Sequence, residues 1–394
     1  MNQQSHLSGL DRFCADKLAE MEAKSGRRKL AVTHRRTQAR ANRQDRPDDE
    51  LISFSCNDYL GLSQHPDVIA AARDAATQYG TGAGGSRLIT GNHPLFAALE
   101  RKLADIKNTE DCVVFGSGYM ANIGLVPALA GAGDLLLVDE LAHACLFAGG
   151  QLSAAEMMRF KHNDMADLER QLDAQRHHFD KCLILTDGVF SMDGDLAALP
   201  ELRQLADRHQ CWLVTDDAHG LGVIGNGRGS PHVFSPVIYP DIQMGTLSKA
   251  VGGYGGYICA SHVVCEFLRN RARSFVYSTG LPPINIAVAT AALDIIMADE
   301  ALRERPLSLA RLFCDLMDMP PPASPIVPVI IGDNDRALAL SNELADAGYL
   351  VGAIRPPTVP AGSARLRVTF NAGHDEADIE KLAALIKAGC ADSR

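Results

Sequence analysis

The segment Met244-Gly245-Thr246-Leu247-Ser248-Lys249-Ala250 decides the fold class, because it places a lysine just after a short apolar strand, Ile242–Met244. A lysine that forms an imine has to lose its proton easily, so it belongs in a partly desolvated pocket beside another cationic centre. The hydroxyls of Thr246 and Ser248 are within reach of a phosphate bound there. Taken alone, the segment fits a turn with a surface lysine equally well. A second candidate residue is therefore needed to decide between an imine-forming lysine and a surface lysine.

The segment Thr215-Asp216-Asp217-Ala218-His219-Gly220 supplies that residue, because it follows the apolar strand Cys211–Val214. A carboxylate at the end of a buried strand is desolvated and needs a cationic partner, and the protonated pyridine nitrogen of pyridoxal phosphate is such a partner. Asp216 fits this role. His219 fits either a hydrogen bond to the phenolic oxygen of that cofactor or an ordinary satisfied polar position. Lys249 and Asp216, each at a strand end, together predict a pyridoxal-phosphate enzyme.

A glycine turn, Gly116-Ser117-Gly118-Tyr119-Met120-Ala121-Asn122, lies between an apolar strand and a helix. Glycines such as Gly118 let backbone N–H groups at a helix N-terminus face an anion such as phosphate, and Tyr119 could cover a planar ring. Turns before helices are more often structural than functional, so this signal gains weight only beside the other two.

Two further segments follow predicted strands. In Asp187-Gly188-Val189-Phe190-Ser191-Met192-Asp193-Gly194, Ser191 could reach the phenolate or the phosphate of the cofactor, while Asp193-Gly194 is a turn signal. His143 follows the strand Leu135–Val138 and fits either stacking on a cofactor ring or capping a helix. We predict that these side chains join Lys249 at one edge of a sheet.

Helical stretches alternate with short apolar strands from about Pro66 onward, which predicts an α/β fold with a mainly parallel sheet between helices. The character of the chain changes after about Pro282, where a long helix, Ile284–Ala298, precedes alternating strands and helices. We predict an N-terminal helix and basic arm over residues 1–60, a large cofactor-binding domain over 61–282 and a small C-terminal α+β domain over 283–394.

Charge and composition exclude several classes of protein. The net charge of −10 argues against nucleic-acid binding, and the basic arm Arg27–Arg46 lacks interleaved aromatic residues, so it suits solvent or an anionic substrate better. The ten cysteines show no C-x-x-C pair, and no third ligand accompanies Asp216-Asp217, so we predict no metal site. No apolar run has the length of a membrane helix, and no leader segment is evident. We predict a cytoplasmic enzyme.

In combination, the motifs SGYMAN, DGVFSMDGD, DDAHG and GTLSKA resemble those of the α-oxoamine synthases, and the resemblance extends from about Asn57 to His374. It implies a fold-type-I pyridoxal-phosphate transferase with a mainly parallel seven-stranded sheet, a small C-terminal α+β domain and a homodimeric assembly.

The resemblance also implies a role for individual residues. Lys249 would carry the cofactor as an imine, with Asp216 on the pyridine nitrogen and His143 stacked on the ring. The other cofactor contacts implied are Gly118, Tyr119, Ser191, His219 and Thr246. For the substrate, Arg355 and Asn57 would hold the amino-acid carboxylate and Thr358 would line the acyl pocket. The acyl-binding arginine of the family would correspond to Arg27 or to a neighbour such as Arg28.

The segment Ala353–Pro360, followed by Ala364–Arg367, resembles the members of the family that condense L-alanine with a pimeloyl thioester of CoA or of acyl-carrier protein. The reaction implied is decarboxylative acyl transfer. Sister enzymes that join glycine to acetyl-CoA or succinyl-CoA are the nearest alternative. A non-catalytic regulator that keeps the cofactor fold is the alternative from another class.

Overall fold

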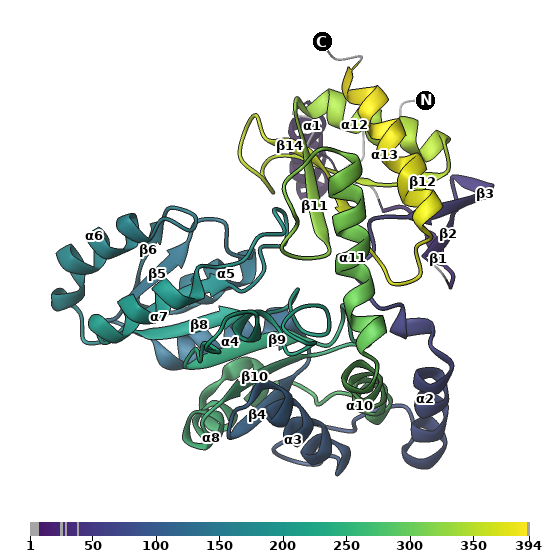
Figure 1. Ribbon diagram of the computed structural model, residues 1–394. Helices are drawn as coiled ribbons and strands as arrows, with labels where there is room; N and C mark the ends of the chain where they lie inside the picture. Colours follow the sequence, from purple (N-terminus) through teal and green to yellow (C-terminus); the bar gives the residue numbers. More distant parts are fainter. Residues whose placement is uncertain (1–7, 24–26, 28–29, 38, 392–394) are drawn as a thin grey trace.

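A seven-stranded sheet forms the centre of the computed structural model, which describes residues 8–23, 27, 30–37 and 39–391. Its order is β4-β10-β9-β8-β7-β5-β6 (Figure 1). The strands are β4 (Asp111–Phe115), β5 (Leu135–Asp139), β6 (Glu156–Phe160), β7 (Cys182–Asp187), β8 (Trp212–Asp216), β9 (Ile242–Thr246) and β10 (Gly256–Ala260). Only β10 runs antiparallel to its neighbours in this sheet. The predicted mainly parallel α/β fold is confirmed.

Helices cover both faces of this sheet because its central strands are apolar on both sides. In β5, Leu136 and Val138 pack into one buried cluster while Leu135 and Leu137 pack into another. The first cluster is closed by α4 (Gly118–Leu129), α5 (Ala144–Leu152), α8 (His262–Arg271) and α9 (Arg273–Val276). The second is closed by α6 (Met165–Gln175) and α7 (Leu199–Arg208), and a third cluster involves α2 (Pro66–Tyr79), α3 (Leu95–Lys107) and α10 (Pro283–Ala298).

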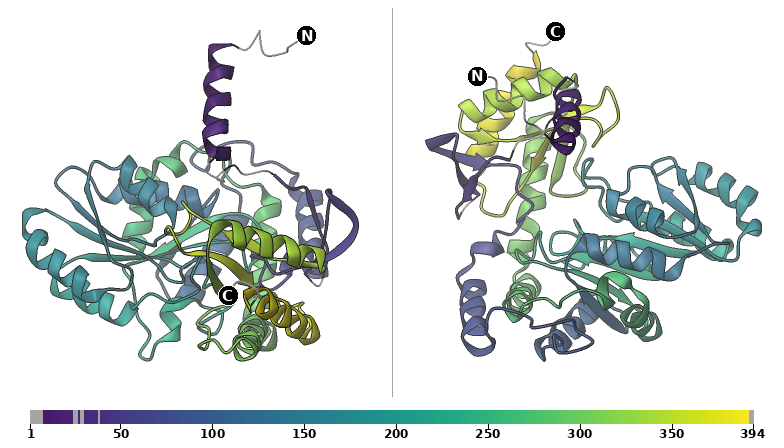
Figure 2. Two further views of the ribbon diagram at one scale, coloured as in Figure 1. Left: turned by 90° about the horizontal axis from the view of Figure 1, so that it is seen from above. Right: turned by 180° about the vertical axis from the view of Figure 1, so that it is seen from behind.

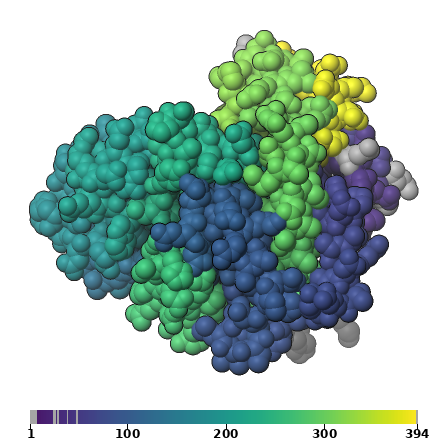
Figure 3. Space-filling model, turned by 60° about the horizontal axis from the view of Figure 1, so that its bottom comes forward, coloured from purple at the N-terminus to yellow at the C-terminus, as the bar shows by residue number. Residues whose placement is uncertain are grey.

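The C-terminal part builds a separate core around a three-stranded antiparallel sheet, β11-β14-β13. Its strands and helices are β11 (Ile326–Gly332), β13 (Gly352–Ile354), β14 (Ala364–Thr369), α11 (Glu300–Leu316), α12 (Asn334–Asp346) and α13 (Glu376–Ala391). Figure 3 shows the light-green residues after α10 as a continuous column that joins this part to the rest of the molecule.

The segment before the large sheet lies with the C-terminal part. Strands β1 (Thr33–Arg35), β2 (Arg40–Arg43) and β3 (Arg46–Ser53) form a four-stranded sheet with β12 (Tyr349–Leu350), which runs parallel to β3. The predicted basic arm therefore contributes a sheet in addition to charge. The division at residues 60 and 282 stays a prediction.

Helix α1 (Gly9–Ala23) projects from the molecule, as the left view of Figure 2 shows, and it buries none of its residues. Leu10, Phe13, Leu18 and Met21 are all exposed, although their spacing places them along one side of the helix. In the part of the chain that the structure describes, no helix has the length and hydropathy needed to cross a membrane.

Candidate active site

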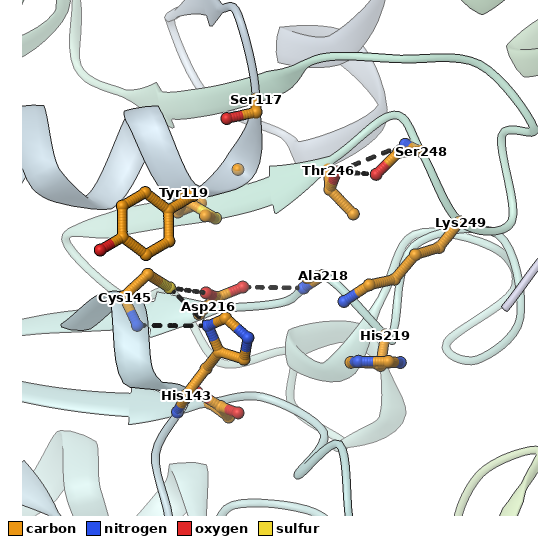
Figure 4. Close-up of a pocket in the computed structure, with 13 residues that line it drawn as sticks. Ser117, Tyr119, His143, Cys145, Asp216, Ala218, His219, Thr246, Ser248 and Lys249 are labelled. Atoms are coloured by element: carbon orange, nitrogen blue, oxygen red, sulfur yellow. Dashed lines mark hydrogen bonds between the residues drawn. The ribbon is translucent and has the colours of Figure 1, made fainter. Parts of the chain in front are cut away.

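A cavity of about 190 Å³ opens where the carboxyl ends of the parallel strands meet (Figure 4). The last residue of β7 and the loops after β4, β5, β8 and β9 all contribute to it. Its lining residues are Ser117, Gly118, Tyr119, His143, Cys145, Asp187, Asp216, Ala218, His219, Met244, Thr246, Ser248 and Lys249. This is the edge of an open α/β sheet at which ligands bind.

One end of the cavity is built to hold an anion. Ser117 caps α4, because its hydroxyl accepts a hydrogen bond from the backbone N–H of Met120 at 3.1 Å. The first N–H groups of a helix have no carbonyl one turn earlier to accept them, so they face an approaching anion. On the opposite side, the hydroxyls of Thr246 and Ser248 lie 2.7 Å apart. Two sets of donors therefore converge on one position.

The turn at Ser117–Gly118, called the anion turn from here on, depends on a glycine of the neighbouring strand. Gly256 begins β10, and a Cβ added there would lie only 2.5 Å from the backbone nitrogen of Gly118 and from the carbonyl of Ser117. No real Cβ tolerates such an approach, so the turn occupies the space that a side chain at position 256 would need. Glycine at position 256 thus allows the close approach of two backbone segments.

Asp216 lies at the floor of the cavity and is only 4% exposed. Its Oδ2 accepts a hydrogen bond from Asn122 Nδ2 at 2.7 Å, and its Oδ1 accepts the backbone N–H of Ala218 at 3.1 Å. These donors satisfy the carboxylate without neutralising its charge. Asp216 is thus suited to face a cationic ring nitrogen.

Lys249 extends its amine into the cavity toward Asp216 and His143, as Figure 4 shows. Burial lowers the pKa of Lys249 to about 8, although Asp216 and then Asp187 act in the opposite direction. Burial also lowers the pKa of His143, which Asp216 opposes and Lys249 reinforces. Burial, followed by the nearby Asp216, raises the pKa of Asp187 well above its ordinary value. An amine that gives up its proton near neutral pH is a competent nucleophile and base.

A chain of hydrogen bonds leads from His219 to the C-terminal part. His219 Nδ1 lies 2.7 Å from the hydroxyl of the buried Tyr59, which lies 3.3 Å from Asn57 Oδ1. Asn57 Oδ1 in turn accepts Arg367 Nη1 at 3.1 Å. Burial, and then the cationic Lys249 and Arg367, lower the pKa of His219 far below its ordinary value. His219 is therefore a neutral ring whose orientation Tyr59 fixes.

Comparison with known proteins gives this geometry its context. The family model described as aminotransferase class I and II matches residues 49–386. The chain belongs to the aminotransferase class I and II family. The described part of the chain contains no group of three or more His, Cys, Asp or Glu side chains arranged to hold a metal ion.

Two curated relatives within this family share more than half of their aligned residues with the chain. The 8-amino-7-oxononanoate synthase of Maricaulis maris is 56% identical over 383 residues, which are 97% of each chain. The 8-amino-7-oxononanoate synthase of Beijerinckia indica is 52% identical over 380 residues, 96% of this chain and 98% of that protein.

Solved structures agree with this family. A serine palmitoyltransferase of Sphingomonas wittichii superposes with a TM-score of 0.88 at 31% identity, covering 97% of both chains. A serine palmitoyltransferase structure that contains pyridoxal phosphate gives a TM-score of 0.89 at 31% identity, over 97% of this chain and 98% of the other. The 8-amino-7-oxononanoate synthase of Francisella tularensis gives 0.74 at 28% identity, over 86% of this chain and 97% of the other.

Pyridoxal phosphate is the cofactor of this family member, and the cavity fits it. The turn at Ser117 and the hydroxyls of Thr246 and Ser248 offer donors to a phosphate. Asp216 offers a buried carboxylate to the ring nitrogen, and Lys249 offers an amine of lowered pKa to the aldehyde. The phosphate, the ring nitrogen and the aldehyde of the cofactor would thus each meet the chemistry they require.

The structure brings seven of the predicted site residues together at the cavity, namely Gly118, Tyr119, His143, Asp216, His219, Thr246 and Lys249. Others lie elsewhere. Asn57 reaches the site through Tyr59, and the backbone carbonyl of Ser191 accepts a hydrogen bond from Arg367 Nε. Neither is a lining residue.

The other predicted substrate-binding residues, Arg355 for the carboxylate and Thr358 and Arg27 for the acyl group, do not line the cavity. Arg355 begins a turn in which its carbonyl accepts the backbone N–H of Thr358 at 3.1 Å, and Thr358 is exposed. Arg27 is exposed on the arm and pairs with Glu22 at 3.2 Å. Arg28 lies outside the described residues.

Four residues that contact the site had no predicted role: Asn122, Cys145, Tyr59 and Arg367. Two of them carry a signal in the sequence. Asn122 is an amide within the apolar helix GYMANIGLVPAL, and such a group needs a partner once buried. Arg367 alternates with apolar residues in the strand ARLRVT, where it is 7% exposed and needs acceptors.

Proposed function

We propose that this chain condenses L-alanine with a pimeloyl thioester and releases carbon dioxide and the free thiol, which yields 8-amino-7-oxononanoate, a precursor of biotin. The observation that carries the proposal is the 56% identity, over 97% of both chains, to a relative named for that product. The cavity adds the lysine, the carboxylate and the anion turn that such a reaction requires.

The first task of the site is to weaken the bond between the α-carbon of alanine and its hydrogen. Bound pyridoxal phosphate supplies an aldehyde that combines with amines and an electron-withdrawing ring. Asp216, whose buried carboxylate accepts hydrogen bonds from Asn122 and Ala218, would face the ring nitrogen and favour its protonated form. Lys249, whose pKa is lowered to about 8, accepts the α-proton as a neutral amine and later returns a proton.

The substrate carboxylate needs a cation near Lys249. Arg367 is buried beside Asn57 and contributes to the lowered pKa of Lys249, so its charge acts within the site. We therefore assign the carboxylate to Arg367 together with Asn57. Arg355, which was expected to hold this carboxylate with Asn57, stays a proposed substrate-binding residue, and Thr358 stays proposed for the acyl pocket. Arg27 stays a proposed acyl-binding residue on the arm.

Turnover with a panel of donors tests this function. Purified protein is given L-alanine with pimeloyl-CoA or pimeloyl-acyl-carrier protein, glycine with acetyl-CoA or succinyl-CoA, and L-serine with palmitoyl-CoA. We expect thiol release and carbon dioxide only with alanine and a pimeloyl donor. A clear preference for glycine or serine contradicts the proposal. The Lys249→Ala variant is the control, which should lose both turnover and the cofactor-lysine bond that borohydride traps.

We also propose a homodimer. Helix α1 buries none of its residues, yet Leu10 and Phe13 along it are 71% and 60% exposed, which a second copy of the chain would cover. Sedimentation velocity at micromolar concentration should give the mass of two chains. A single-chain mass under these conditions contradicts this assembly.

A further inference from the structure

Cys145 contacts three side chains of the site, those of His143, Asn122 and Asp216. It is the second residue of α5, is 2% exposed and lines the cavity. Its sulfur lies 2.7 Å from His143 Nδ1 and 3.0 Å from Asn122 Nδ2. The distance from this sulfur to Asp216 Oδ2 is 3.7 Å. Figure 4 shows the sulfur beside both the imidazole and the carboxylate.

The direction of these hydrogen bonds follows from the groups present. The amide of Asn122 carries only donor hydrogens on Nδ2, so toward Asn122 the sulfur accepts. The single hydrogen of the thiol has two acceptors within reach, Asp216 Oδ2 at 3.7 Å and His143 Nδ1 at 2.7 Å, and we assign it to the nearer one, Nδ1. That nitrogen also accepts the backbone N–H of Cys145 at 3.3 Å, because His143 caps α5. A ring nitrogen that accepts two donors carries no hydrogen, so the hydrogen of the neutral ring is on Nε2.

Neutrality of this ring matters because Lys249 shares the cavity. Burial lowers the pKa of His143, with Asp216 acting against this shift and Lys249 acting with it. The thiol has no charge of its own to add, since burial and then Asp216 raise the pKa of Cys145. The donor at Nδ1 is therefore a neutral group that favours the neutral ring.

We propose that Cys145 is a positioning residue, whose thiol is oriented by Asn122 and holds the imidazole of His143 beside Asp216 with hydrogen on Nε2. The inference rests on the proposed function, because it places His143 on the cofactor side of that site. Serine could replace the thiol as a donor to Nδ1, whereas alanine could not.

Three variants test this role: Cys145→Ala, Cys145→Ser and, as a matched control, Cys314→Ala. Cys314 is also buried, at 1% exposure, but it packs in the apolar core of the C-terminal part. The first measurement is the dissociation constant of pyridoxal phosphate from refilled apoenzyme. The second is the pH at the midpoint of the change in visible absorbance of the holoenzyme.

We expect Cys145→Ala to weaken cofactor binding by about threefold to tenfold, as the loss of one hydrogen bond predicts, and to move the absorbance midpoint. Cys145→Ser should stay within about twofold of the wild type, and Cys314→Ala should change neither quantity. In a His143→Ala background, Cys145→Ala should have no additional effect, because the residue acts through His143.

An unchanged dissociation constant and midpoint in Cys145→Ala would overturn the proposal. An equally large effect of Cys145→Ala in the His143→Ala background would overturn it too, since that result indicates packing alone. Neither measurement uses an acyl donor. A failure of this inference is thus distinguishable from a failure of the proposed reaction.

Discussion

Breaking the ion pair between Lys107 and Asp217 should destabilise the protein strongly. Both side chains are fully buried, and Lys107 Nζ lies 2.6 Å from Asp217 Oδ2. Removing one partner of a buried pair leaves an uncompensated charge and costs roughly 3–5 kcal/mol. With an unfolding entropy of roughly 2.1 cal/mol/K per residue, a chain of 394 residues should then melt about 4–6 °C lower. Lys107→Met is the variant, and differential scanning fluorimetry gives the melting temperature.

Helix α3, which ends at Lys107, also contains the residue for the control. Lys102→Met removes a lysine of α3 whose ion pair with Asp294 is partly exposed, and such pairs contribute about 0–1 kcal/mol. It should melt within about 1 °C of the wild type. Adding Asp217→Asn to Lys107→Met removes the stranded charge, while the amide oxygen still accepts the Ser230 N–H, so stability should partly return. A Lys107→Met protein that melts with the wild type refutes this reasoning.

Three further predictions concern individual groups. Tyr59→Phe removes the hydroxyl that contacts His219 Nδ1. It should weaken binding of pyridoxal phosphate by about threefold to tenfold in a fluorescence titration. Tyr257→Phe removes a buried hydroxyl with no partner in the described chain, so equal losses in both variants contradict this assignment. Gly256→Ala should weaken cofactor binding by more than about tenfold, whereas Gly82→Ala, with open space around it, should not. Although burial acts against the charged ring, the hydrogen bonds that it donates to Asp139 and Asp195 raise the pKa of His162 to about 10. The melting temperature should therefore fall as the pH rises from about 6.5 to 10, and His162→Gln should lack that decline.

The sequence predicts the part of the site that depends on strand ends. Lys249, Asp216 and Gly118 each follow a short apolar segment, and parallel strands bring such ends to one edge of the sheet. Strands β6 and β10 are harder to recognise. Strand β6 reads Glu-Met-Met-Arg-Phe, which has neither a continuous apolar run nor strict alternation. Strand β10 begins within a glycine-rich stretch that resembles a turn.

The contacts between distant segments could not be predicted from local patterns. Arg367 and Asn57 are 310 residues apart, and only the packing of β14 beside the segment after β3 brings them together. Arg365 and Arg367 alternate with apolar residues and therefore point to the same face of β14, so the pattern leaves open which of them reaches the site. Cys145 reads as a core cysteine because its polar partners come from three different loops and helices.

The contact between Gly256 and the turn at Ser117–Gly118 has an evolutionary consequence. Position 256 cannot accept a side chain whatever residues stand at 117 and 118, because a Cβ there would collide with their backbone. Glycine should therefore be retained at this position among descendants of a common ancestor that keep the turn. A designer who transfers this turn to another sheet has to place a glycine at the facing position of the neighbouring strand as well.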